Sequence, residues 1–149
     1  MHRVKPPFRA DHVGSLLRTA PLKEAREKRA RGEITAEALT AIEDREIEGV
    51  IRKQEMIGLQ SATDGEYRRI SWNYDFLENL DNVESYAGER KIKFAATGPQ
   101  PRPILLRVIG KLGGYKPHPM IEHFKFLTAH AKETAKLRMI VELAEEVWR

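Results

Sequence analysis

Two short polar segments carry the side chains best suited to bind a small molecule. Gly14-Ser15 follows the stretch from Phe8 to Val13, which we expect to be a short strand. Asp64-Gly65-Glu66 follows a second expected strand, Leu59 to Thr63. A strand, a helical connection and a second strand form a βαβ unit with parallel strands, and functional groups gather at the carboxyl ends of such strands. The spacing therefore predicts that the two polar segments lie side by side.

Local signals define two helices between these expected strands. Pro21 suits the first turn of a helix that runs to about Arg31, where Gly32 ends it. Thr35 is a suitable N-cap residue for a longer helix that Gly58 ends. The apolar residues of this longer helix fall on one half of its circumference and make it amphipathic: Leu39, Ile42, Ile47, Val50, Ile51 and Ile57.

The rest of the chain predicts further short elements. We expect a short helix over residues 72–80 and a β-hairpin over residues 91–112, with the prolines of this stretch in its loop. A loop over residues 113–119, a helix over about 119–134 and a final helix over 137–148 follow. Strands that alternate with helices indicate an α/β fold.

The composition limits the class of protein. The 149 residues suffice for about one domain, with 41% apolar and 32% charged residues. The net charge is +4, and the basic residues are interspersed with acidic ones instead of forming a basic patch. We therefore expect no nucleic-acid binding. The N-terminus lacks the apolar core of a signal peptide, and no apolar run approaches the ~18 residues of a membrane span. These features predict a cytoplasmic protein without a membrane partner.

Metal binding is not predicted. The chain contains no cysteine, so it has no thiolate ligand and no cysteine nucleophile. His118, Glu122, His123 and His130 lie close in sequence, but no two of these histidines have the i, i+4 spacing of a helical zinc motif. We interpret them as ordinary helix side chains and assign no metal ligand.

A longer pattern resembles a known family. Its most specific parts are the segments Phe8 to Arg18 and Thr63 to Arg69. Further matching residues are Ile42-Glu43-Asp44, Gln54, Gly58-Leu59, Trp72, Asp75-Phe76-Leu77, Gly110-Lys111, His118-Pro119 and Phe126-Leu127. In this order, the chain resembles the catalytic barrel of the cobalamin-independent methionine synthases, and most closely their short, single-domain bacterial relatives.

The resemblance implies a (β/α)8 barrel that moves a methyl group from a methyl-folate to the sulfur of homocysteine, in methionine biosynthesis. In that family a zinc ion lowers the pKa of the homocysteine thiol, so that the thiolate is the nucleophile. The family's zinc ligands include cysteine and have no counterpart in this chain. We therefore expect no cofactor here, no catalytic residue and no methyl transfer by this chain alone.

The resemblance also implies an incomplete barrel, because a complete one takes about 250 residues or more. Residues 1–136 resemble the N-terminal part of the barrel, with two βα units and a hairpin excursion, and residues 137–149 resemble its last helix. We interpret residues 1–149 as one partial barrel domain that has lost an internal segment. A deleted gene copy, a pseudogene product and a faulty gene model all explain this pattern.

The resemblance assigns a homocysteine site to Val13, Gly14, Ser15 and Glu66. The glycine turn holds the amino-acid end of the substrate, and the Glu66 carboxylate pairs with its ammonium group through a charge-assisted contact. The alternative is an ordinary turn beside a surface acid.

Three residues adjoin this site, each with two interpretations. His12 contacts the pocket, or it is a hydrogen-bonded histidine at a strand end. Asp64 supports the pocket, or it caps its own turn. Arg68, together with Arg18 and Arg69, binds folate carboxylates or forms ion pairs with neighbouring acids.

Two functions from different classes remain open. The first is a protein of the homocysteine methyltransferase type that has lost its zinc ligands. The second is a non-catalytic interaction module or remnant that associates with itself or with a partner barrel, because a two-stranded sheet leaves an open edge. Size-exclusion chromatography with light scattering separates the two, since a strict monomer counts against the module.

Overall fold

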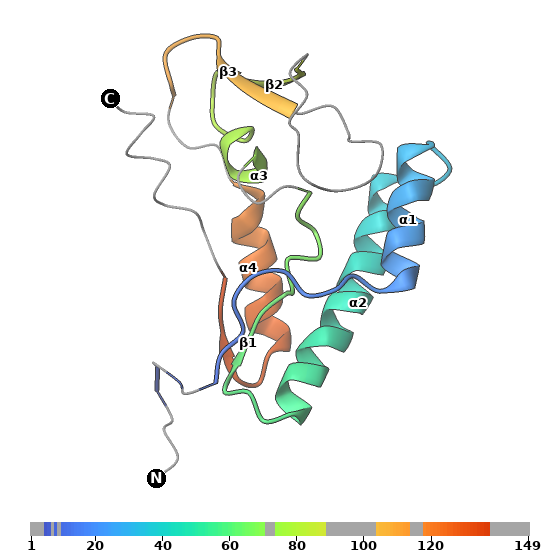
Figure 1. The fold of residues 1–149 in the computed structure, drawn as a ribbon, viewed down its shortest axis with the longest axis vertical. Helices are drawn as coiled ribbons and strands as arrows, with labels where there is room; N and C mark the ends of the chain where they lie inside the picture. The colour runs from blue at the N-terminus through green and yellow to red at the C-terminus, as the bar shows by residue number, and fades with distance from the viewer. Residues whose placement is uncertain are drawn as a thin grey trace, which may run out of the picture. The chain divides into compact units, whose positions relative to one another are not determined.

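The computed structural model describes residues 5–6, 8, 10–70, 74–88, 104–113 and 118–137 (Figure 1). The chain divides into two compact units. Unit 1 consists of Met1–Arg69 and Met120–Met139, and unit 2 consists of Ile70–Pro119 and Ile140–Arg149. Helices and small sheets in the described residues make this an α/β protein, as the sequence predicts.

Unit 1 begins with two helices, α1 (Ala20–Ala30) and α2 (Ala36–Met56). The hydroxyl oxygens of Thr19 and Thr35 accept hydrogen bonds from the first turns of α1 and α2, which satisfies backbone donors that have no partner within a helix. Gly32 and Gly58 follow the two helices with φ of +76° and +85°. Both helices thus begin and end where the sequence predicts.

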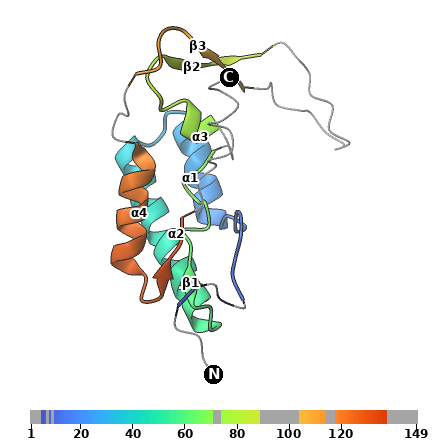
Figure 2. The same cartoon turned by 90° about the vertical axis from the view of Figure 1, so that its left-hand side faces the viewer.

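A parallel strand pair completes unit 1. Strand β1 (Ser61–Ala62) pairs with β4 (Thr134–Ala135), and helix α4 (Pro119–His130) makes the connection into β4. In the sequence, nearly all of unit 2 is inserted between β1 and α4. Helices α2 and α4 lie side by side (Figure 2), and the Arg52 guanidinium of α2 donates to the carbonyl of His130 at 3.0 Å.

The core of unit 1 lies between these helices and β1. Its fully buried large side chains come from all three helices of the unit: Leu22, Ile47, Ile51 and Leu127. Val50, Ala62 and Tyr67 extend the same cluster. The buried residues of α2 recur at helical spacing, so the amphipathic pattern correctly identifies the face that packs inward.

Unit 2 contains a short helix, α3 (Tyr74–Leu77), and an antiparallel hairpin of β2 (Val83–Ala87) and β3 (Ile104–Val108). The register pairs Val83 with Val108 and Ala87 with Ile104. The sequence correctly predicts a hairpin, but it places the first strand at residues 91–95, which lie outside the described residues. The pairing strand is instead β2, whose residues do not alternate clearly between apolar and polar.

The predicted strand from Phe8 to Val13 is wrong, because the described residues in this range have no strand geometry. Instead of a backbone ladder, the segment is joined to β1 by side chains. Ser61 Oγ donates to Asp11 Oδ1 at 2.6 Å. Beyond this segment and past the end of β1, one backbone bond runs from the Leu16 N–H to the Gly65 carbonyl at 3.0 Å. The βαβ unit expected between the first two strands therefore does not form, and the parallel pair is β1 with β4.

Other predicted elements are shorter than expected. β1 covers two residues of the range 59–63, α3 covers four residues of 72–80, and α4 ends at His130 instead of about residue 134. Strand β4 was not predicted at all. The predicted final helix lies outside the described residues apart from Leu137. None of the described helices is both long enough and apolar enough to cross a membrane.

Candidate functional site

The candidate site is built on a tight turn, residues 63–69, that follows β1 directly. The Asp64 side chain accepts the Glu66 N–H at 2.9 Å, and the Thr63 hydroxyl accepts the Gly65 N–H at 3.1 Å. Gly65 and Glu66 both have positive φ, +66° and +56°. A non-glycine residue in this region is uncommon, so the surrounding contacts must hold Glu66 there. Asp64 thus caps its own turn, one of the two roles predicted for it.

The turn meets the segment around Ser15, as the spacing of the two polar segments predicts. Ser15 Oγ donates to Glu66 Oε2 at 2.6 Å. The backbone bond from Leu16 to Gly65 and a bond from the Tyr67 hydroxyl to the Leu17 carbonyl at 3.0 Å hold the two segments together on either side of this contact. Side chains far apart in sequence are therefore brought into direct contact at the carboxyl end of β1.

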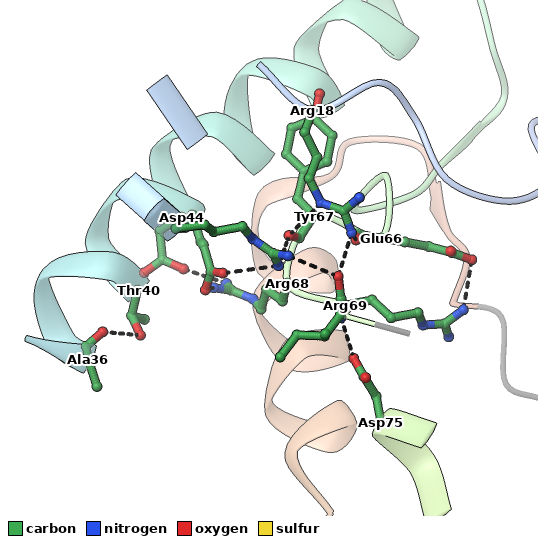
Figure 3. Close-up of polar contacts among 12 residues, drawn as sticks. Arg18, Ala36, Thr40, Asp44, Glu66, Tyr67, Arg68, Arg69 and Asp75 are labelled. Atoms are coloured by element: carbon green, nitrogen blue, oxygen red, sulfur yellow. Dashed lines mark hydrogen bonds and ion pairs between the residues drawn. The ribbon is translucent and has the colours of Figure 1, made fainter. Parts of the chain in front are cut away.

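The Glu66 carboxylate is shared between two donors. Its Oε2 accepts from Ser15. Its Oε1 pairs with the Arg69 guanidinium at 2.9 Å (Figure 3). The Glu66 side chain is 14% exposed, whereas Ser15 is exposed. A carboxylate that is largely shielded from water makes stronger contacts than a fully hydrated one. Ser15 therefore places one end of this contact at the protein surface.

The other residues predicted around this site are arranged as follows. Gly14 has φ of +91°, and a Cβ at this position would meet nothing within 4 Å. Val13 is 61% exposed. The His12 ring Nε2 lies 2.9 Å from the Gly14 carbonyl oxygen, so the His12 ring supports the glycine turn.

Gln54, a buried residue of α2, anchors the start of the turn. Its amide group donates to the Thr63 carbonyl at 2.8 Å and accepts the Thr63 N–H at 3.1 Å. This two-way contact satisfies a backbone N–H and a carbonyl that are buried away from water. The sequence pattern includes Gln54 but does not reveal this role, because no local signal links a helix residue to a strand end.

A buried charge cluster lies on the other side of the turn. Arg68 pairs with Glu43 at 3.5 Å and with Asp44, and Arg26 pairs with Glu43 at 3.6 Å. Burial raises the pKa of Glu43 above its usual value, although Arg68 and Arg26 oppose the shift. Figure 3 shows Arg68 directed towards Asp44. Of the two roles predicted for Arg68, the structure therefore shows the second, ion pairs with neighbouring acids.

A further ion pair connects the ends of unit 1. Lys136, which follows β4, donates to the carboxylate of Asp11, and its ammonium group also donates to the His12 carbonyl at 3.1 Å. The hydrogen bond from Lys136 lowers the pKa of Asp11, and the bond from Ser61 acts in the same direction. These contacts fix the segment that leads into Gly14 and Ser15.

The donor set does not fit a zinc site. The chain has no cysteine, and the described residues contain no group of three His, Asp or Glu side chains arranged to hold a metal ion. Two of the histidines that lie close in sequence contact nearby backbone carbonyls. His118 Nε2 lies 3.2 Å from the Phe76 carbonyl oxygen, and His130 Nδ1 lies 2.8 Å from that of Phe126.

Comparisons with known proteins find relatives of parts of this chain. No family model matches the chain. "Uncharacterized protein YxjH" of Bacillus subtilis is 52% identical over 123 residues, which are 83% of this chain and 32% of that protein. A 5-methyltetrahydropteroyltriglutamate–homocysteine methyltransferase of Candida albicans is 36% identical over 96 residues, 59% of this chain and 12% of that protein.

A solved structure is also similar. The crystal structure of the "Putative Vitamin-B12 Independent Methionine Synthase" from Listeria monocytogenes matches with a TM-score of 0.64 and 37% identity, over 95% of this chain and 43% of that chain. The present chain spans about a third of the length of the Bacillus relative and less than half of the Listeria chain. It therefore corresponds to a part of each of these proteins.

Proposed function

From its partial homology to the cobalamin-independent methionine synthases, we propose that this chain retains one side of a homocysteine-binding site. The resemblance to that family, first evident in the sequence, is confirmed by the methyltransferase and methionine synthase relatives. The observation that carries the proposal is the direct contact between Ser15 and Glu66, two residues on separate segments that the resemblance assigns to the substrate.

The chemistry of an amino-acid ligand suits this contact. The Glu66 carboxylate binds the ammonium group of homocysteine, and the polar turn of Val13, Gly14 and Ser15 contacts its carboxylate end. Arg69 holds one oxygen of Glu66 and orients the carboxylate, so that the oxygen bonded to Ser15 faces the ligand. Methyl-folate is the second substrate that the family resemblance implies, and we assign it no residue here.

We propose that this polypeptide does not transfer a methyl group by itself. The side chains present do not fit zinc, and no step is assigned to a metal ion. A homocysteine thiol without activation has a pKa near 8.5 and is mostly protonated at neutral pH. Purified protein supplied with homocysteine, methyl-folate and zinc should therefore form no methionine above the level of a protein-free control.

We further propose an incomplete (β/α)8 barrel for the fold. The parallel pair of β1 and β4, joined through α4, is the kind of unit from which such barrels are built. The match to less than half of the Listeria chain supports the same idea. The tail at residues 137–149 is proposed to resemble the last barrel helix, joined here after an internal deletion.

Isothermal titration with homocysteine tests the proposed site. We expect E66Q to bind homocysteine about ten-fold to a hundred-fold more weakly than the wild type, because the charge-assisted contact is lost while the shape is kept. E24Q is the matched control, since Glu24 is an exposed acid of α1 whose ion pair with Lys28 lies on the surface of that helix. Equal affinities of E66Q and the wild type would contradict the proposal.

A second candidate function is a non-catalytic module that associates with itself or with a partner barrel. The observation in its favour is the exposure of two large apolar side chains on α4, Ile121 (52%) and Phe124 (40%). Light scattering on the purified chain separates the candidates, because the module predicts a mass above that of one chain.

A further inference from the structure

Two arginines outside the 63–69 turn hold its carbonyl groups. Arg18 Nη2 donates to the Glu66 carbonyl at 3.0 Å and also to the Arg69 carbonyl. Arg26 of α1 donates to the Tyr67 carbonyl at 2.5 Å and to the Arg69 carbonyl at 3.2 Å. The carbonyl of Tyr67 lies also 3.5 Å from Arg18 Nε. Three of the turn's carbonyls therefore face two guanidinium groups.

This arrangement determines the backbone conformation of Glu66. Because the peptide bond is planar, φ and ψ of Glu66 set the relative orientation of the Gly65 and Glu66 carbonyls. The Leu16 N–H holds the Gly65 carbonyl and Arg18 holds the Glu66 carbonyl, so both angles are restricted. Arg26 fixes the next carbonyl, that of Tyr67. Glu66 needs such restraint because its φ of +56° is unfavourable for a residue with a Cβ. The planar guanidinium, with five N–H donors in a rigid fork, can bind several carbonyls at once.

The direction of the Glu66 side chain depends on this backbone conformation. With Glu66 in the left-handed region, its carboxylate reaches Ser15 and Arg69. A return to ordinary backbone angles would redirect the Cα–Cβ bond and separate the carboxylate from Ser15. Figure 3 shows Arg18 reaching the turn close to Glu66 and Tyr67.

We propose that Arg18 and Arg26 are positioning residues for Glu66, and that they thereby set the selectivity of the site for a ligand with an α-ammonium group. The inference rests on the proposed function, because it takes Glu66 as the partner of that ammonium group. We assign neither arginine a contact with the ligand. Both act through the backbone of the turn.

The test compares homocysteine with 4-sulfanylbutanoic acid, which lacks the α-amino group. In R18Q and R26Q we expect affinity for homocysteine to fall about five-fold, with little change for the analogue, so that the ratio of the two affinities falls by the same factor. R18K should recover part of the ratio, because an ammonium group can hold fewer carbonyls than a guanidinium. R45Q is the matched control, since Arg45 is 66% exposed on α2 and pairs with Glu46. A purely structural role would weaken both ligands equally, and that result would overturn the proposal.

A second measurement separates this inference from the proposed function. If the wild type binds no homocysteine, the proposed function fails, and amide hydrogen exchange then decides the positioning role. The Leu16 and Glu66 amides, bonded to Gly65 and Asp64, should exchange faster in R18Q than in R45Q. Equal exchange rates in the two variants would sink the positioning role, whereas faster exchange in R18Q alone supports it.

Discussion

Replacing Arg68 with methionine is expected to lower the free energy of unfolding by about 3 kcal/mol at pH 7, the lower end of the cost of removing one partner of a buried ion pair. The Arg68 side chain is 8% exposed and lies 3.5 Å from Glu43, which is 10% exposed. The substitution also removes the pair with Asp44 and the stacking of the guanidinium on the Phe126 ring. Glu43 keeps Arg26, which limits the loss.

The loss in R68M should depend on pH in a defined direction. Burial already raises the pKa of Glu43 above 4.5, and Arg68 is the strongest opposing influence, so its removal raises this pKa further. A carboxyl group whose pKa is raised in the folded state takes up a proton on folding when the pH lies between 4.5 and the raised pKa. Its ionised form destabilises the fold above that window, and the penalty disappears as the pH falls through it. The deficit of R68M should therefore be smaller at pH 5 than at pH 7.

Urea unfolding of R68M, E43Q/R68M and R45M at both pH values provides the measurement. The double variant should regain much of the stability at pH 7, because the uncompensated carboxylate is gone. R45M should stay within about 0.5 kcal/mol of the wild type, as expected for an exposed arginine. A deficit in R68M that is identical at the two pH values would show that lost packing, and not the charge of Glu43, explains the effect.

Replacing Gly65 with alanine is expected to destabilise the protein by about 3 kcal/mol, from two causes that add. A residue with a Cβ at φ of +66° costs about 1–2 kcal/mol. The new Cβ would also lie 3.0 Å from Tyr67 Cε1 and 3.2 Å from the Leu16 Cβ, and crowding in a packed region costs about 1–3 kcal/mol. Tyr67 cannot move easily, because it is buried in the core and its hydroxyl bonds to Leu17.

The matched control for this substitution is G32A. Gly32 also has a positive φ, +76°, but a Cβ there would meet nothing within 4 Å. G32A should therefore show the backbone cost alone, about 1–2 kcal/mol. Denaturant unfolding of the two variants measures the difference. Equal losses would mean that the turn can shift to admit a methyl group, and that the close approach of Tyr67 and Leu16 is not a constraint.

The helices of unit 1 were predictable because their signals are local. A threonine cap precedes each of α1 and α2, and Gly32 and Gly58 follow them, so a short window of sequence contains the information. The strands were predictable only in part: β1 and β3 fall inside expected strands, but their partners β4 and β2 do not. A strand needs a partner that the local sequence does not specify. The stretch from Phe8 to Val13 has a suitable pattern but contributes no ladder, whereas the two residues of β4 pair without any pattern to mark them.

The candidate site shows the same division. Contact between Ser15 and Glu66 was predictable because each follows an expected strand, and the contact forms even though the first of those strands does not. The supporting roles of Gln54, Arg18 and Arg26 were not predictable. Each of these side chains binds backbone carbonyls of the 63–69 turn. Every residue has a backbone carbonyl, so the residue types in the sequence do not show which carbonyl will be bound.

The insertion of unit 2 between β1 and α4 has a consequence for the order of assembly. α1 and α2 contact each other across a short connection, so they can associate early. The parallel pair joins Ser61 to Thr134, and its closure must wait until the chain beyond the excursion has been made. During synthesis on the ribosome, α1 and α2 would therefore associate while β1 still lacks its partner strand. The hairpin would emerge next, and β4 would pair with β1 last.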